Sequence, residues 1–270
     1  MNKAGKQKVL FLKEEYADGQ GKYTYPNGES YVGDWKNGKF HGKGTYTSPD
    51  EGKYEGKFKS GNRDGKGIIT TLDGCKFVGK FKNDKAEGHG KATFNNGEIL
   101  EGEWKDEELS GHGTYTSPDG EKYVGGWKNS EFHGNGVHTF PDGSKYEGGF
   151  KGDNRNGKGI ITTPDGCKFV GKFKSDKAEG HGKITFKSGD VLEGEWKDGE
   201  RDSQSKYTWS SGEKYVGKYV NDSLDGQGTY SFHDGFKLVG EFRDDEFWNG
   251  NEYNKEGKVV GKYVNGVSKQ

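Results

Sequence analysis

The stretch YVGDWKNGKFHGKGTYTSPDEGK, residues 31–53, recurs along almost the whole chain. Equivalent positions return every 23 residues, and the repeats begin at Tyr31, Tyr54, Phe77, Leu100, Tyr123, Tyr146, Phe169, Leu192, Tyr215 and Leu238. A fixed period of this length indicates a repeat architecture, in which each repeat packs chiefly against its neighbours. The chain is therefore a linear array rather than one or two globular domains.

Each repeat predicts two short β-strands and two turns. In the first copy, residues 31–35 alternate in period two, which places Tyr31, Gly33 and Trp35 on one face. The second strand spans 42–48. Asn37-Gly38 favours a turn within a longer connection between the strands, so the turn need not be a tight two-residue hairpin. Pro-Asp-Gly, as at 118–120, then turns the chain into the next repeat.

The composition predicts a thin core of rings and glycines. Only 27% of the residues are hydrophobic and 49 are glycine, but six Trp, 15 Tyr and 16 Phe supply apolar surface. A buried aromatic side chain covers ~150–250 Å². The Trp35 position is aromatic and the Gly33 position is glycine in all ten repeats. We expect rings of one strand to lie over the bare backbone of glycines on its neighbour.

The two ends of the array depart from the pattern. We assign 1–30 to a degenerate N-terminal repeat that caps the array, whose first half around 9–12 has lost its glycine. Ten repeats occupy 31–258, and 259–270 form a C-terminal half-repeat or cap. In the repeat at Leu192 the second-strand glycines are replaced by Ser203 and Ser205, and in the repeat at Leu238 by Asn249 and Asn251. We interpret these changes as an end cap; a partner site at that end is the alternative.

The chain also contains a longer duplication, in addition to the 23-residue period. Residues 62–94 return almost unchanged at 154–186, so a block of four repeats, spaced by 92 residues, was copied. The two cysteines, Cys75 and Cys167, are separated by this same interval. A disulfide needs Cα atoms within ~7 Å, and four hairpins span far more than that. We expect both thiols to be reduced.

The pattern Y-x-G-x-W-K-x-G-x-x-x-G-x-G-x-x-x-x-P-D-G, carried in register over about 16–266, resembles the MORN (membrane occupation and recognition nexus) repeat. The resemblance implies an all-β fold, an elongated, twisted single antiparallel sheet of tandem β-hairpins, solenoid-like in its repetition. It also implies a platform for protein partners and, in some members, for phospholipids.

The sequence offers no catalytic constellation. Phosphate-binding loops, kinase motifs, nucleophile elbows and zinc-protease motifs are absent, so we expect no enzyme. Histidines such as His89, His112 and His181 recur in equivalent loop positions ~10 Å or more apart, too far for one metal. We expect no metal and no cofactor. A net charge of −1, from 42 basic and 43 acidic residues, gives no reason to expect nucleic acid.

Two columns are candidate sites. In eight successive repeats a lysine follows the aromatic residue equivalent to Trp35. This row could bind anionic lipid or an acidic partner, although a role in solubility alone would also explain it. We call it the lysine ladder: Lys36, Lys59, Lys82, Lys105, Lys128, Lys151, Lys174 and Lys197. Rings that are chiefly structural could also line a peptide groove: Tyr31, Trp35, Tyr54, Phe58, Phe81, Trp104, Tyr123, Trp127, Phe150, Phe173 and Trp196.

These patterns favour a non-catalytic scaffold or adaptor that binds a protein partner at a membrane or cytoskeletal surface. The alternative is a phosphoinositide-binding or regulatory module of a phosphatidylinositol phosphate kinase-like system. A secreted carbohydrate- or cell-wall-binding repeat protein is a third hypothesis, disfavoured because four apolar residues at 9–12 are too few for a signal peptide. We expect a cytoplasmic chain that is not secreted, with membrane or cytoskeletal association and with dimerisation through an array end as further hypotheses.

Overall fold

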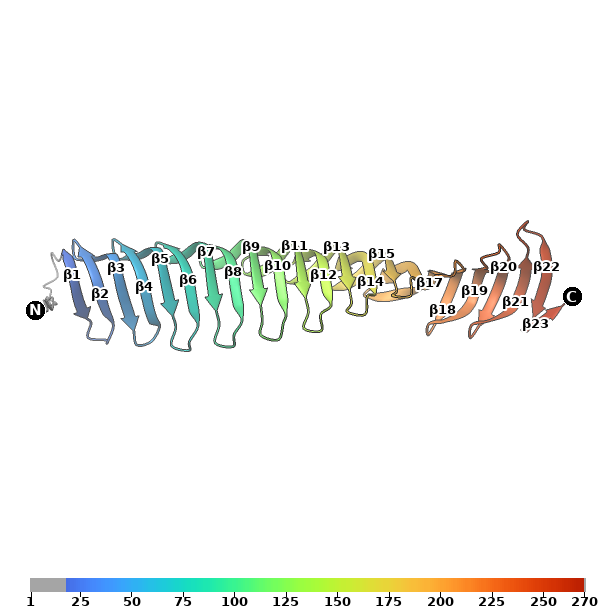
Figure 1. Cartoon of the computed structure of the whole chain (residues 1–270), viewed down its shortest axis with the longest axis horizontal. Helices are drawn as coiled ribbons and strands as arrows, with labels where there is room; N and C mark the ends of the chain where they lie inside the picture. The colour runs from blue at the N-terminus through green and yellow to red at the C-terminus, as the bar shows by residue number, and fades with distance from the viewer. Residues whose placement is uncertain (1–17, 270) are drawn as a thin grey trace, which may run out of the picture. The chain divides into compact units, whose positions relative to one another are not determined.

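The computed structural model describes residues 18–269, which fold into 23 β-strands (Figure 1). The chain divides into two compact units, Met1–Pro141 and Asp142–Gln270, here called the N-terminal and C-terminal units. The half-repeat predicted around residues 9–12 lies outside the described residues.

The N-terminal unit contains eleven of the described strands. They are β1 (Gly19–Thr24), β2 (Ser30–Lys36), β3 (Lys39–Ser48), β4 (Gly52–Lys59), β5 (Asn62–Thr70), β6 (Lys76–Lys82), β7 (Lys85–Thr93), β8 (Ile99–Lys105), β9 (Glu108–Thr116), β10 (Lys122–Lys128) and β11 (Glu131–Thr139). Each strand pairs antiparallel with the next one along the chain.

The C-terminal unit contains the remaining twelve. They are β12 (Lys145–Lys151), β13 (Asn154–Thr162), β14 (Lys168–Lys174), β15 (Lys177–Thr185), β16 (Val191–Lys197), β17 (Glu200–Thr208), β18 (Lys214–Val220), β19 (Ser223–Ser231), β20 (Lys237–Arg243), β21 (Glu246–Tyr253), β22 (Val259–Val264) and β23 (Val267–Lys269). Consecutive strands again pair antiparallel. The predicted all-β architecture of tandem hairpins is confirmed.

The turn inside each repeat is tighter than the sequence suggested. Lys36 pairs directly with Lys39, so only Asn37 and Gly38 lie between the strands. Both have positive φ, 50° and 69°, as a type I′ hairpin turn requires. The expectation of a longer connection was wrong, because a bulge in β3 takes up the residues that the sequence pattern places in the loop.

The bulge explains one of the two second-strand glycines. Gly33 pairs with Gly44, but Asp34 pairs with His41, so Gly42 and Lys43 are skipped in the pairing with β2, while on the other side they pair with Phe58 and Lys57 of β4. Gly42 has a φ of 59°, a left-handed conformation that glycine adopts without strain. The Asp34 carboxylate accepts a hydrogen bond from the Lys43 backbone N–H at 2.9 Å.

The other glycine pair makes room for a ring. The Tyr31 side chain is fully buried and lies over Gly33 and Gly44, where an added Cβ would come within 3.0 Å of its hydroxyl or ring atoms. Its hydroxyl donates to the Asp34 carbonyl at 2.8 Å. The same bond joins Tyr54 to Lys57. The prediction that rings lie over bare glycine backbone is confirmed.

Successive repeats are joined by edge-to-face ring contacts. The Tyr31 ring lies 5.1 Å from Trp35 in its own repeat and 5.2 Å from Phe58 in the next, with interplanar angles of 88° in both cases. In the C-terminal unit Tyr146 contacts Phe150 and Phe173 in the same way, both at 5.1 Å. These pairs form a core one ring deep within each unit.

The last full repeat differs from its predicted alignment. Gly250, rather than Asn249 or Asn251, pairs with Gly240, so the glycine pair is kept and the bulge is one residue shorter. Asn249 instead donates to the Glu241 carboxylate at 2.8 Å and accepts the Asn265 N–H at 2.8 Å. The assignment of this repeat as one that had lost its glycines was wrong, whereas Ser205 does replace glycine opposite Gly194.

Candidate functional site: a groove on the ring face

The ring face is the face of the β-sheet that, in each unit, carries Tyr31, Trp35 and their equivalents. All the predicted groove aromatics are buried except Trp104, which is half-buried. Their surfaces are covered by other side chains of the same face. The residues that solvent and a ligand can reach on this face are therefore not the predicted aromatics but the side chains that cover them.

One covering column is formed by the equivalents of Phe40. The Phe40 ring stacks on Tyr31 with centroids 3.9 Å apart, and Phe132 stacks on Tyr123 at 3.7 Å. Arginine takes this position in other repeats: the Arg63 guanidinium lies 5.8 Å from the Tyr54 ring and 5.4 Å from Phe81. The column reads Phe40, Arg63, Ala86, Leu109, Phe132 in one unit and Arg155, Ala178, Arg201, Leu224, Phe247 in the other.

A second column pairs a ring with a carboxylate from the preceding repeat. The Tyr115 hydroxyl donates to Glu98 at 3.0 Å, Tyr207 donates to Asp190 at 2.9 Å, and His138 contacts Glu121 at 2.7 Å. Repeats with Ile or Ala in place of the ring have Gly, Cys or Ser in place of the carboxylate. The sequence-based predictions did not include these residues, although this co-occurrence within the repeats could have revealed them.

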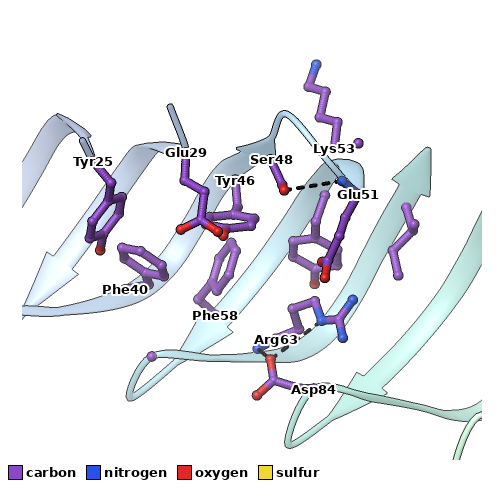
Figure 2. A pocket seen from close by; sticks show the side chains of 14 residues that line it. Tyr25, Glu29, Phe40, Tyr46, Ser48, Glu51, Lys53, Phe58, Arg63 and Asp84 are labelled. Carbon is purple, nitrogen blue, oxygen red and sulfur yellow. Dashed lines mark hydrogen bonds and ion pairs between the residues drawn. The ribbon is translucent and has the colours of Figure 1, made fainter. Parts of the chain in front are cut away.

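The ring face of the N-terminal unit is hollowed between β1 and β5. Figure 2 shows the groove, whose volume is about 430 Å³. The half-buried rings of Tyr25, Phe40 and Tyr46 line it, and the buried Tyr54 and Phe58 form its floor. Burial, followed by a hydrogen bond to Glu29, raises the pKa of Tyr46 to about 12. Tyr46 is therefore a neutral donor at physiological pH.

The groove has an acidic side. Glu29 and Glu51 direct their carboxylates into it, whereas Lys53 points away (Figure 2). Neither glutamate has an ion-pair partner within 4.0 Å among residues 18–269. On the other side, Arg63 is paired with Asp84 at 3.5 Å. The negative charge of the glutamates is thus available to a cationic group on a ligand.

A local departure from the repeat positions Glu51. The first copy reads Pro-Asp-Glu-Gly where other copies read Pro-Asp-Gly, and β3 and β4 pair as far as Ser48 and Gly52. The Ser48 hydroxyl accepts the Asp50 and Glu51 backbone N–H groups at 3.3 and 3.2 Å. This turn holds the Glu51 side chain beside Tyr46, whose ionisation the carboxylate further disfavours.

In both units the lysine ladder lies along one edge of the ring-bearing strands, where those strands end. Every ladder lysine is exposed and is the last residue of its strand, from Lys36 at the end of β2 to Lys197 at the end of β16. Within the described residues none has an ion-pair partner within 4.0 Å. The residue opposite varies: Lys82 faces Lys85, but Lys105 faces Glu108.

Two further kinds of feature bear on function, metal centres and membrane-spanning helices. Residues 18–269 contain no cluster of three or more His, Cys, Asp or Glu side chains that could hold a metal ion. In that same range no helix is long and apolar enough to cross a membrane. Cys75 and Cys167 are both free and half-buried.

Comparison with solved structures finds distant likenesses. The TCP domain of SAS-4 (dCPAP) from Drosophila melanogaster, solved in complex with a proline-rich motif of Ana2 (dSTIL), is 12% identical, with a TM-score of 0.40 over 66% of this chain and 90% of that one. The TCP10 domain of CPAP from Danio rerio, in complex with a peptide of STIL, is 14% identical, with a TM-score of 0.30 over 90% and 98%. The comparison with curated proteins yields no match.

The MORN repeat family matches ten tandem segments. They are 16–30, 31–53, 54–76, 77–99, 101–122, 123–145, 146–168, 169–191, 193–214 and 215–236. The last full repeat and the C-terminal hairpin, which lie beyond residue 236, are outside these segments. With its hairpins, glycine pairs and ring ladder in register with these segments, the chain belongs to the MORN repeat family.

Proposed function

We propose that this chain is a non-catalytic scaffold whose ring-face groove, lined by Tyr25, Phe40 and Tyr46, receives a segment of a protein partner. The observation that carries the proposal is the groove itself: half-buried aromatic walls beside two carboxylates that have no ion-pair partner within 4.0 Å among residues 18–269. Aromatic side chains held rigidly at a surface are typical of residues that dominate binding energy. The carboxylates favour a partner segment that carries apolar and basic side chains.

A charge reversal in the groove tests this proposal. Glu51→Lys changes an exposed side chain, and Glu103→Lys makes the same charge change on the opposite face, where Glu103 pairs with His89. Both variants should keep the parent's circular dichroism. We expect a stoichiometric partner, isolated with the full chain from native complexes, to be lost with Glu51→Lys and kept with Glu103→Lys. Equal retention by both variants, or no stoichiometric partner, would count against the groove.

The lysine ladder supports a second candidate function, binding of anionic phospholipid at a membrane surface. Its support is the row of exposed lysines without ion-pair partners, since each lysine near a charged membrane contributes ~1 kcal/mol. The N-terminal unit alone presents five of them. The glutamates that face Lys105 and Lys128 offset part of this field.

Vesicle sedimentation at physiological salt tests the lipid proposal. We expect the parent chain to sediment with phosphoinositide-containing vesicles and not with neutral ones. Replacing Lys82, Lys105 and Lys128 with glutamate should abolish the sedimentation, and replacing them with arginine should preserve it. A parent chain that stays in the supernatant contradicts this function and leaves the groove proposal standing.

A further inference from the structure

Five half-buried aromatic side chains form a continuous stripe on the ring face of the C-terminal unit: Phe186, Tyr207, Trp209, Tyr230 and Phe232. The ring centroids of successive members are 5.9, 4.7, 5.2 and 4.9 Å apart. The rings belong to β17 and β19 and to the residues that directly follow β15, β17 and β19. We call this set the aromatic stripe.

The aromatic stripe packs against the core on one side and is accessible to solvent on the other. Tyr207, Trp209 and Tyr230 pack against the buried cluster of Tyr215, Tyr219, Leu224 and Phe242. Their outer surfaces remain accessible. Because these rings are already packed against the core, binding of a ligand to them costs little conformational entropy of the aromatic side chains.

Two carboxylates accompany the stripe at the same period. Asp190 accepts the Tyr207 hydroxyl at 2.9 Å and the Ser210 N–H at 2.7 Å, and Glu213 is bonded to Tyr230 in the next repeat. Neither has an ion-pair partner within 4.0 Å among the described residues of the unit. The stripe therefore presents negative charge once per repeat.

The spacing of the repeats selects the conformation of a ligand. Two strands at ~4.8 Å each advance the array by about 9.6 Å per repeat. A polyproline II helix makes one turn in three residues of ~3.1 Å each, about 9.3 Å, so it presents the same side to every repeat. An α-helix, with a pitch of ~5.4 Å, and a β-strand, with a two-residue period of ~6.8 Å, do not match this spacing.

From these observations we infer that the aromatic stripe binds a polyproline II segment with prolines three residues apart and with Arg or Lys side chains directed at Asp190 and Glu213. The segment runs across the strands, and one turn of its polyproline II helix contacts each repeat. The inference rests on the proposed function, because it names the partner chemistry of a second stretch of the ring face. Aromatic-lined surfaces recognise such preformed helices with a small entropic cost.

Fluorescence anisotropy with the full chain tests the inference. The probe is a labelled twelve-residue peptide with proline at every third position and arginines between. We expect saturable binding that weakens when prolines become alanine and when arginines become glutamate. Trp209→Ala should weaken it about tenfold or more, since tryptophan is typical of binding hot spots. Val216→Ala, an exposed valine at 52% on the opposite face of the same unit, should leave it unchanged.

The outcomes separate this inference from the proposed function. No binding by the parent, equal binding of the alanine peptide, or equal binding by a folded Trp209→Ala chain overturns it. If circular dichroism shows that Trp209→Ala disturbs the fold, Asp190→Asn with the arginine peptide decides the case: severalfold weaker binding supports the inference, and unchanged binding overturns it. Glu51→Lys, in the other unit, should not alter the affinity for the peptide. Loss of the native partner with that variant therefore tests the proposed function of the groove and not the inference about the stripe.

Discussion

The duplicated blocks, 62–94 in the N-terminal unit and 154–186 in the C-terminal unit, differ at only four positions. Their ring contacts are the same: the guanidinium of Arg63, like that of Arg155, lies 5.8 and 5.4 Å from two rings. Asp84 and Asp176 accept the backbone N–H of these arginines at 2.8 and 2.9 Å. Nearly equal sequences therefore give similar hairpins in the two units, although the Arg63–Asp84 distance is 3.5 Å and the Arg155–Asp176 distance is 3.1 Å.

The surfaces that distinguish the units lie mainly outside the copied blocks, although Arg63 and Asp84 line one side of the groove and Phe186 ends the aromatic stripe. The groove before the first block depends on Glu29, Tyr46 and Glu51, and the aromatic stripe after the second depends chiefly on Tyr207 and Trp209. The copied residues therefore build the hairpins in both units, and the residues that make each surface different from its counterpart lie in the flanking repeats. Matched substitutions in the two blocks measure how far this separation holds.

The largest effect should follow from filling the space beneath the buried tyrosine. Gly67→Ala and Gly159→Ala each place a Cβ within 3.0 Å of the ring atoms of Tyr54 or Tyr146, which cannot move because they are buried. Overpacking of this kind costs about 3 kcal/mol. Urea unfolding should show the same loss for both variants.

The repeat at Leu192 supplies the control. There a leucine replaces the tyrosine and Ser205 is accommodated opposite Gly194. Combining Tyr54→Leu with Gly67→Ala should therefore cost less than the sum of the two single changes. Strict additivity would show that the ring does not explain the glycine.

A smaller loss should follow from removing the carboxylate that accepts a backbone N–H across repeats. Asp84→Ala and Asp176→Ala leave the Arg63 and Arg155 N–H groups without this acceptor and place alanine at positive φ where aspartate has 71° and 68°. We expect about 2 kcal/mol in each unit. Asn in place of Asp keeps an acceptor and tolerates the left-handed conformation, so it should cost less than half as much. Unequal losses from the two alanine variants would contradict the equivalence of the blocks.

The repeat period, the strands and the ring-over-glycine core followed from the sequence, because each rests on a local rule repeated many times. The Asn37-Gly38 turn was misjudged since the bulge at Gly42 is a property of strand pairing, which no single segment displays. The side chains that wall the groove were missed for a related reason: Glu29 meets Tyr46 only through pairing of neighbouring hairpins. The predicted groove aromatics, except the half-buried Trp104, are buried, and residues of the Phe40 column pack over several of them.

A pH-dependent effect should distinguish repeats with tyrosine from those with phenylalanine at their first position. Burial raises the pKa of Tyr54 to about 12 from an ordinary value of 10.0. The folded state therefore favours the neutral phenol, and the stabilisation is complete below pH 10 and is lost as the pH rises from 10 to 12. Tyr54→Phe should cost about 1 kcal/mol at pH 7, through loss of the bond to the Lys57 carbonyl, and less at pH 11. A cost that does not shrink at alkaline pH contradicts this interpretation.

The smallest effect concerns one of the four positions at which the blocks differ. Leu72, which is 66% exposed, precedes Asp73-Gly74 in the turn after β5, and its counterpart in the other unit is Pro164. Proline is favoured at this turn position, and the turn bond from the Gly74 N–H to the Thr71 carbonyl does not use the Leu72 N–H. Leu72→Pro should raise the free energy of unfolding by about 0.5 kcal/mol through the unfolded state, and Pro164→Leu should lower it by the same amount. Opposite signs of equal size, measured by urea unfolding, would show that the two blocks share one backbone; a loss in both directions would show that their turns differ despite the common sequence around them.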